Sequence, residues 1–296
     1  MKKVTDGIEY FAVRLLTAYS GSLSEHGALR FGASLGGFAR RLLRSRVKVV
    51  LENIRLCGVS FGSRRKLKLF VTRCFQHIGV TAIEILRQKS YRDSDFEKKI
   101  VCEDKKYLEE AYRLKRGAVL MSGHFGNWEL MGTYIRHLGY PVDLLVKRQS
   151  NRRLDGFINS FRTAQGVGII YTDIGMRALV EAVRKGRFVA ILADQYGGAE
   201  SEPAKLFGKD ILVPTGPAAL IQKYNSPLIF GASRRAKNGR HKLTIEMINK
   251  WDGYSRSQIV QKYTELLENA IRISPEMWLW THRKFKNLTD YCGTVK

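Results

Sequence analysis

The chain carries the run Gly117-Ala118-Val119-Leu120-Met121-Ser122-Gly123-His124-Phe125-Gly126-Asn127-Trp128-Glu129-Leu130. Residues 117–121 are apolar enough to form a buried strand, and the two glycines that follow, Gly123 and Gly126, allow a tight turn. A helix is expected to begin near Asn127, a residue type that caps helices. This stretch therefore predicts a strand–turn–helix bend, which is the repeating unit of a layered α/β fold.

His124 and Glu129 of this run are candidates for a proton-transfer pair. Their spacing of five positions is poor for one helix face, so they make most sense at a bend. A neutral histidine can remove a proton near neutral pH, while a carboxylate accepts a hydrogen bond from the other ring nitrogen and stabilises the imidazolium. The alternative is a hydrogen-bonded histidine at a strand end beside a solvated glutamate.

The chain beyond residue 100 alternates between short strands and helices. Strands are expected at residues 118–121, 142–146, 168–171, 188–193, 228–232 and 243–248, and helices at 176–185, 214–224 and 255–273. Such alternation predicts an α/β fold with a largely parallel or mixed central sheet flanked by helices.

The first 95 residues have a different texture, helical and basic. Residues 1–73 hold 15 Lys and Arg against 4 Asp and Glu, a net charge of +11. Apolar stretches beside basic clusters are typical of a membrane-associating surface, although a solvated helix face gives the same pattern. We expect residues 1–95 to form this helical region and residues 96–296 the catalytic α/β region, joined in one continuous globular unit.

The composition narrows the classes of partner. A net charge of +24 over 296 residues implies an anionic partner: nucleic acid, an anionic membrane surface, a phosphorylated small molecule or an acidic protein. The four cysteines contain no CxxC pair and the six histidines are scattered, so we expect reduced thiols, no metal site and no cofactor. No uncharged apolar run approaches the roughly 18 residues of a membrane span, and no signal peptide is evident.

Further candidate site residues follow predicted strands. Asp194 and Gln195 end the strand at residues 188–193, where polar groups commonly line the site of an open α/β sheet; Asp194 could equally cap a turn. Lys147 and Arg148 follow the strand at residues 142–146 and could bind phosphates or acidic sugars, or form a solvated loop.

Three motifs carry a resemblance to a known family. His-Phe-Gly-Asn-Trp-Glu, at residues 124–129, resembles the H-x4-D/E box of the lysophospholipid acyltransferase superfamily, in the wording of its bacterial lipid A branch, the lauroyl/myristoyl acyltransferases. Residues 275–286 resemble the closing P-E-Q-W-x-W-x-H-R-R-F-K signature of that branch, with Met277 where glutamine is usual. Leu-Ala-Asp-Gln at residues 192–195 is the third match, and all three occur in the expected order.

The resemblance implies direct transfer of a fatty acyl group from acyl carrier protein to a hydroxyl of a lipid A precursor. It implies that His124 is the general base and that Glu129 orients the His124 ring. No serine or cysteine nucleophile takes part. The arginine of the family falls on Arg162, where it would recognise an anion or stabilise the developing oxyanion. The remaining expected substrate contacts are Asn127, Lys147, Arg148, Asp194, Gln195, His282 and Arg283.

Two alternatives stay open at this point. One is a relative that uses acyl-CoA and a different glycolipid or lysophospholipid acceptor. The other is a non-enzymatic basic module for nucleic acid, which we do not expect because the strong motifs lie outside the most basic region.

The first 45 residues depart from the family, since Arg14, Glu25 and Arg30 interrupt the apolar runs where many relatives have an anchor helix. We therefore expect peripheral or monotopic attachment at the cytoplasmic face of the bacterial inner membrane, to an anionic surface.

Overall fold

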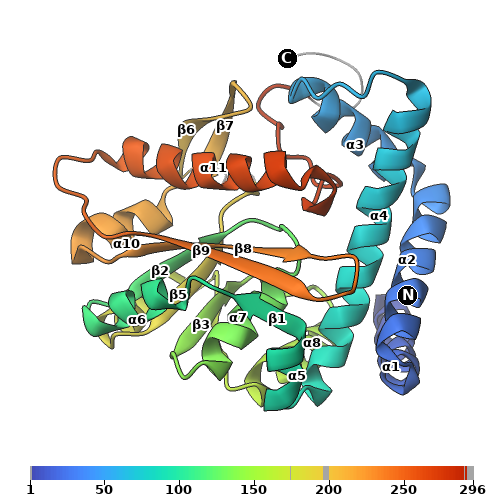
Figure 1. Ribbon diagram of the computed structural model, residues 1–296, viewed down its shortest axis with the longest axis horizontal. Helices are drawn as coiled ribbons and strands as arrows, with labels where there is room; N and C mark the ends of the chain where they lie inside the picture. Colours follow the sequence, from blue (N-terminus) through green and yellow to red (C-terminus); the bar gives the residue numbers. More distant parts are fainter. Residues whose placement is uncertain (1, 174, 196–199, 290, 292–296) are drawn as a thin grey trace.

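The central element of the computed structural model is a seven-stranded sheet (Figure 1), and the structure describes residues 2–173, 175–195, 200–289 and 291. The strand order is β1-β9-β8-β2-β5-β3-β4. All neighbouring strands are parallel except the antiparallel pair β8 and β9, so the sheet is mixed at one side. The strands of this sheet are β1 (Ile100–Cys102), β2 (Ala118–Ser122), β3 (Val142–Val146), β4 (Gly168–Tyr171), β5 (Phe188–Leu192), β8 (Leu228–Arg235) and β9 (His241–Ile248).

Helices cover both faces of the sheet, as an α/β layer fold requires. Those within and after the sheet region are α5 (Asp93–Lys99), α6 (Lys105–Arg113), α7 (Trp128–His137), α8 (Arg152–Ala164), α9 (Gly175–Arg184), α10 (Gly216–Tyr224) and α11 (Arg256–Ile273). Side chains of β2 alternate between two core clusters, because successive residues of a strand point to opposite faces. Val119 and Met121 pack with α11, whereas Ala118 and Leu120 pack with α6 and α7. The predicted α/β fold with a mixed sheet is confirmed.

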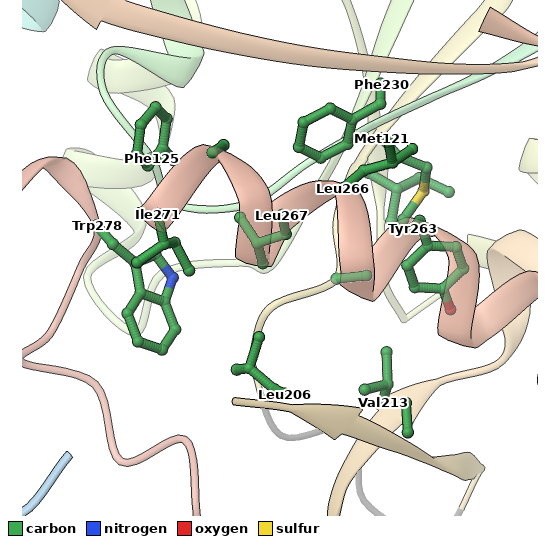
Figure 2. Packing of buried hydrophobic residues seen from close by; sticks show 14 of the residues in the cluster. Met121, Phe125, Leu206, Val213, Phe230, Tyr263, Leu266, Leu267, Ile271 and Trp278 are labelled. Carbon is green, nitrogen blue, oxygen red and sulfur yellow. The ribbon is translucent and has the colours of Figure 1, made fainter. Parts of the chain in front are cut away.

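The face covered by α11 holds much of the apolar core (Figure 2). Tyr263, Leu266 and Leu267 of α11 point between Met121 of the sheet and Leu206 of a separate hairpin. That hairpin pairs β6 (Ser201–Leu206) with β7 (Lys209–Pro214) and was not expected from the sequence. It packs against the outer side of α11, so that this helix is enclosed between sheet and hairpin.

The first part of the chain is helical as expected and lies against one side of the sheet region (Figure 1). Its helices are α1 (Lys2–Ser22), α2 (Glu25–Leu42), α3 (Arg44–Leu56) and α4 (Arg64–Arg87), followed by the 3-10 turn η1 (Gln88–Ser90). A second 3-10 turn, η2 (Pro275–Met277), follows α11 near the other end of the chain. Glycines let α2 and α4 touch: a Cβ on Gly79 would lie 2.2 Å from the carbonyl oxygen of Gly32.

Among the described residues, one helical segment, Arg64–Ser90, is long and apolar enough to be a candidate membrane span. An 18-residue stretch of this segment has a mean hydropathy of 1.3, and 56% of that stretch is buried inside the protein. Phe70, Cys74 and Phe75 of this segment belong to the main apolar core. The apolar composition of this segment is therefore explained by its packing as the central helix of the N-terminal region, without a membrane span.

Candidate active site

The loop between β2 and α7 carries His124 and is fixed on both sides by backbone contacts. Phe125 forms an isolated antiparallel bridge with Trp278, and Gly126 forms a parallel bridge with Ser233 of β8. Gly126 has a φ of +61°, and a Cβ there would lie 1.5 Å from the Ser233 carbonyl oxygen. Only glycine fits at this position, because both the backbone conformation and the close approach exclude a side chain. The predicted strand–turn–helix bend is confirmed.

Asp194 is the carboxylate that orients His124. The Nδ1 of His124 donates to Oδ1 of Asp194 at 2.7 Å, and the His124 backbone N–H donates to Oδ2 at 2.9 Å. Because an ionised carboxylate can only accept, Nδ1 carries the ring proton and Nε2 is left as the basic atom. The side-chain amide of Gln195 lies 3.2 Å from that Nε2 and is placed to donate to it. Asp194 and Gln195 are thus brought together with His124.

The surroundings make His124 a stronger base than an ordinary histidine. Burial disfavours the charged ring, but the charge and hydrogen bond of Asp194, with the charge of Glu129, outweigh burial and raise the pKa of His124 above 6.5. Burial likewise acts against ionisation of Asp194, yet the charge and hydrogen bonds of His124, with the Lys284 charge, hold the pKa of this carboxyl well below its usual range. The pair is arranged to accept a proton at Nε2 and stabilise the resulting imidazolium.

The closing motif supplies two more groups around Asp194. The indole N–H of Trp278 donates to Oδ2 of Asp194 at 2.9 Å. The Lys284 side chain is 1% exposed, and its Nζ has no hydrogen-bond partner within the described part of the chain. Burial, opposed by the Asp194 charge, lowers the pKa of Lys284 to about 8. Trp278 and Trp280 are core residues, at 2% and 0% exposure.

Glu129 does not orient His124, and this expectation is corrected. Glu129 forms a two-point ion pair with Arg162 of α8: Nε of Arg162 donates to Oε2 at 2.9 Å, and Nη2 donates to Oε1. Arg162 also donates to Asn159 at 2.6 Å. The physical reason is the direction of α7, which carries Glu129 toward α8 while the His124 ring turns to the end of β5. Arg162 is consequently a paired arginine and not an isolated one.

Asn127 is also placed differently from expectation. Its Oδ1 accepts from the backbone N–H of Leu130 at 3.0 Å and so caps α7, and its Nδ2 donates to Glu84 of α4 at 2.8 Å. Asn127 is 0% exposed, so both ends of its amide serve the fold and neither faces a substrate. Glu84 in turn pairs with Arg235 and His241, forming a buried charged network behind the loop.

A cavity of about 570 Å³ opens beside His124, between the sheet and helices α7 and α8. Its lining combines apolar side chains with polar ones, which is the usual character of a ligand site. The apolar lining comes from Leu120, Met131, Gly132, Leu144, Ile158, Ala190 and Leu192, together with Ile85 of α4. The polar lining includes His124, Glu129, Lys147, Arg162 and Gln195, so five of the expected site residues meet in one place.

Three expected contacts lie outside this cavity. Arg148 forms an ion pair with Asp173 at 2.6 Å and stacks over the Tyr171 ring. His282 lines a second cavity between α2 and α4, and the guanidinium of Arg283 lies over the Tyr291 ring at 6.0 Å from its centroid. These residues do not line the cavity that contains the His124 ring, although His282 lies close enough for the charges of Asp194 and His124 to act on its pKa.

Sequence reasoning missed the role of Trp128. Its ring centroid lies 5.0 Å from that of His124 in an edge-on arrangement, and it lines the same cavity. The signal in the sequence is that Trp128 lies between His124 and Glu129 in the same motif, at the first residue of the helix that follows the His124 loop. No cluster of three or more potential metal ligands occurs among the residues that the structure describes.

The sequence profile of the bacterial lipid A biosynthesis acyltransferases matches residues 4–287. The lipid A biosynthesis palmitoleoyltransferase of Escherichia coli (strain K12) is 24% identical over 260 residues, which cover 86% of this chain and 83% of that protein. The lipid A biosynthesis lauroyltransferase of the same strain is 23% identical over 265 residues, covering 87% and 84%. A Shigella flexneri lipid A biosynthesis acyltransferase is 24% identical over 260 residues, covering 86% and 83%. A match over nearly the whole length, on a chain whose histidine box lines a cavity with many apolar side chains, leads to one conclusion: this chain belongs to the bacterial lipid A biosynthesis acyltransferase family and is an acyltransferase.

Proposed function

We propose that this enzyme transfers a fatty acyl chain from the thioester of acyl carrier protein to a hydroxyl of a lipid A precursor. One observation carries the proposal: the His124 ring, held by Asp194, lines a cavity that also has many apolar side chains in its wall. An acyl chain would lie along those apolar side chains, with its carbonyl carbon near the ring. The cavity volume, about 570 Å³, is within the range of roughly 300–1,000 Å³ typical of small-molecule sites.

The reaction is a direct attack. The acceptor hydroxyl displaces the Gln195 amide from Nε2 and gives its proton to His124 as its oxygen attacks the thioester carbon. The tetrahedral intermediate then collapses, the carbon–sulfur bond breaks, and the thiolate takes the proton from the imidazolium. Asp194 holds the ring and balances its positive charge throughout.

The absence of an acyl-enzyme step in this proposal is supported by the state of the nearest hydroxyl. Ser122, at the end of β2, lines the cavity but donates its proton to the Gly231 carbonyl oxygen at 2.7 Å. Cys57 is buried in the apolar core away from this cavity, and burial raises the pKa of its thiol to about 12. Both groups are therefore poor nucleophiles in this arrangement.

The choice of donor rests on charge. Acyl carrier protein is an acidic partner, and a net charge of +24 favours its approach, with the exposed Lys147 among the residues that line the cavity. Acyl-CoA is also anionic, so the two donors are separated by experiment. Purified protein with a defined lipid A-type acceptor should give acylated product with acyl carrier protein thioester and little with acyl-CoA of the same chain.

The membrane placement that we propose is peripheral or monotopic, on the cytoplasmic face of the inner membrane. One face of α1 carries four apolar residues that are 60–65% exposed: Val4, Ile8, Phe11 and Leu15. In α2, Phe38 is 55% exposed and Leu42 is 64% exposed. Basic residues surround the end of α2, including Arg40, Arg41 and Arg44. An apolar face with basic flanks is suited to lying in the interface of an anionic leaflet.

The function is tested by mass spectrometry of lipid A from cells with the protein and cells without it, and with His124→Ala. The variant should be folded by circular dichroism yet give no added acyl mass, because the base is lost. A paired comparison assigns the orienting carboxylate: Asp194→Asn should reduce turnover about 10³-fold or more, by favouring the wrong ring tautomer. Glu129→Gln should retain far more activity. Full turnover by the His124 variant, or a covalent acyl adduct trapped on the protein, would reject the mechanism.

A further inference from the structure

A second cavity, of about 450 Å³, lies between α2 and α4 and is separate from the one that contains the His124 ring. One wall is formed by Leu35, Ala39 and Leu43, which are four residues apart and so share a face of α2 or follow directly from it. The other wall is Phe75, Ile78 and Ala82 of α4. Leu279, Thr281 and His282 of the closing motif complete it. We call this cavity the α2–α4 groove.

The groove reaches the catalytic loop through the backbone. Leu279, which lines the groove, donates its N–H to the carbonyl oxygen of His124 at 2.9 Å. The two cavities also share α4 as a wall: Ala82 lines the groove and Ile85, less than one helical turn later, lines the cavity beside His124. The groove and the first cavity therefore approach the same catalytic loop from two sides.

The groove is lined mostly by aliphatic and aromatic side chains, with Arg46 and His282 among its polar residues. Arg46 is exposed and reaches the Thr281 carbonyl oxygen at 3.4 Å. The Nε2 of His282 is buried without a hydrogen-bond partner within the described part of the chain, and burial lowers the pKa of this ring to about 4, so Arg46 supplies the positive charge and His282 a neutral imidazole. These two side chains are suited to an anionic oxygen, and the apolar lining to a hydrocarbon chain.

The groove is also continuous with the exposed apolar surface of α2. Leu43 lines it and is itself 48% exposed, and Leu42 beside it is 64% exposed. A lipid resting in a leaflet below this surface can extend one chain along the groove without leaving an apolar environment. A soluble thioester donor gains no such access from that side.

From this arrangement we infer that the α2–α4 groove binds a hydrocarbon chain of the membrane-held acceptor, with an anionic group of that lipid at Arg46 and His282. The inference rests on the proposed function and adds a binding site for the second substrate. The donor chain occupies the cavity beside His124, and an acceptor chain occupies the groove. The loop that carries His124 is reached from both sites, because the His124 ring lines the first cavity and Leu279 of the groove bonds the His124 carbonyl oxygen, and a direct transfer through a ternary complex needs both substrates near this loop.

The test is a pair of variants that fill one site each. Ala82 is exposed and lines the groove, so Ala82→Trp should fold and should raise the KM for the lipid acceptor by about tenfold or more, leaving the KM for the thioester donor unchanged. Ile158→Trp, which fills the cavity beside His124, should raise the KM for the donor instead. Ser34→Trp is the control, because Ser34 is exposed on α2 outside the lining of the groove.

A second measurement does not depend on turnover. Vesicles containing an anionic lipid with a photoreactive group in its acyl chain are irradiated with wild-type protein in the absence of donor. Labelled peptides should come from α2 and α4, and Ala82→Trp and Arg46→Gln should each reduce labelling severalfold. Labelling at the first cavity alone, with an unchanged acceptor KM in Ala82→Trp, would reject the groove while leaving the proposed function intact. Groove labelling without acyl transfer by wild-type protein would reject the function instead.

Discussion

At the scale of single residues, the pKa of His124 is set by three charges that face it from different elements. Asp194 follows β5 and Glu129 lies in α7, and both raise the pKa of His124. Lys284, from the closing motif, lowers it, and burial lowers it further. Arg162 of α8 faces the same cavity but is paired with Glu129. Lys284 is thus a buried cation whose charge opposes protonation of the base and favours its neutral, reactive form.

Replacement of Lys284 should therefore move the pH profile of the enzyme. Lys284→Met removes a positive charge, so the pKa of His124 should rise, by up to about one unit. The acid limb of kcat/KM, which reports loss of the His124 proton, should shift to higher pH by that amount. Lys284→Arg keeps the charge and should restore the wild-type midpoint. A uniform loss of activity with an unmoved limb would mean that Lys284 acts only by packing.

The sequence singled out His124 as the candidate base but did not predict that Asp194 is its hydrogen-bond partner. His124 could be chosen because the motif around it is specific and needs only local strand–turn–helix geometry. Asp194 lies 70 residues later, and its closeness to His124 depends on β2 pairing with β5, which places Ser122 beside Leu192. Strand neighbours in a parallel sheet are not readable from one sequence, since the connections are long. Glu129 is the expected partner from the sequence because it is the carboxylate of the same H-x4-E box.

At the scale of elements, the buried charged network ties α4 to the loop that carries His124. Glu84 of α4 pairs with Arg235 of β8 and His241 of β9, and accepts from Asn127 at the start of α7. Arg235 also donates to Thr81 at 2.9 Å, one helical turn before Glu84. Burial alone would raise the pKa of Glu84, but the charges of Arg235 and His241 outweigh it and hold the pKa well below 4.5.

Removing the charge of Glu84 should destabilise the protein and loosen the loop. Glu84→Gln leaves Arg235 buried without its partner, which should cost about 3–5 kcal/mol in the free energy of unfolding at pH 7, measured in urea. Because the folded-state pKa of Glu84 is depressed, its contribution is complete above about pH 4.5 and declines as the pH falls. The difference between variant and wild type should therefore narrow in acid.

The matched control is Glu52→Gln, which breaks the surface pair with Arg55 in α3. Such exposed pairs contribute at most about 1 kcal/mol, so this variant should unfold close to wild type. Equal effects of the two substitutions would contradict a special role for the buried network.

Regular elements with clear periodicity were predictable, and elements with unusual turns were not. The expected strands at residues 142–146 and 168–171 match β3 and β4. The helix expected at residues 255–273 is α11, which starts at Arg256 because Ser255 is its N-cap. The β6–β7 hairpin was missed because its two-residue turn places Phe207 at φ +52° before Gly208 at φ +71°. Hairpin turns of this kind favour Asn or Gly at both positions, and phenylalanine conceals the signal.

At the scale of the whole molecule, the apolar face of α1 and the basic residues of α2 and α3 set how the enzyme would meet a membrane. About half of the excess charge lies in the first quarter of the chain, where the net charge is +11 of +24. Charge attracts the protein to an anionic leaflet, and burial of exposed apolar side chains holds it there. The division into residues 1–95 and 96–296 stays a prediction.

Vesicle flotation should separate these two contributions. Phe11→Glu places a charge within the exposed face of α1 and should reduce binding to anionic vesicles about tenfold or more at physiological salt. Tyr254→Glu makes a comparable change at a 44% exposed position before α11 and should bind as wild type does. Raising the salt concentration should weaken wild-type binding without abolishing it. Unchanged flotation of the α1 variant would place the membrane contact elsewhere.

The amide of Gln195, 3.2 Å from the basic nitrogen of His124, has a consequence for fidelity. A thioester held beside a free base is open to hydrolysis, which would waste the activated chain. Here any incoming hydroxyl must first compete with a tethered amide for the same lone pair. A lipid hydroxyl held in place by its own tail has a high effective concentration and can compete, whereas a passing water molecule is at a disadvantage. In the proposed reaction, the Gln195 amide would therefore protect the thioester from hydrolysis until an acceptor hydroxyl displaces it from Nε2 of His124.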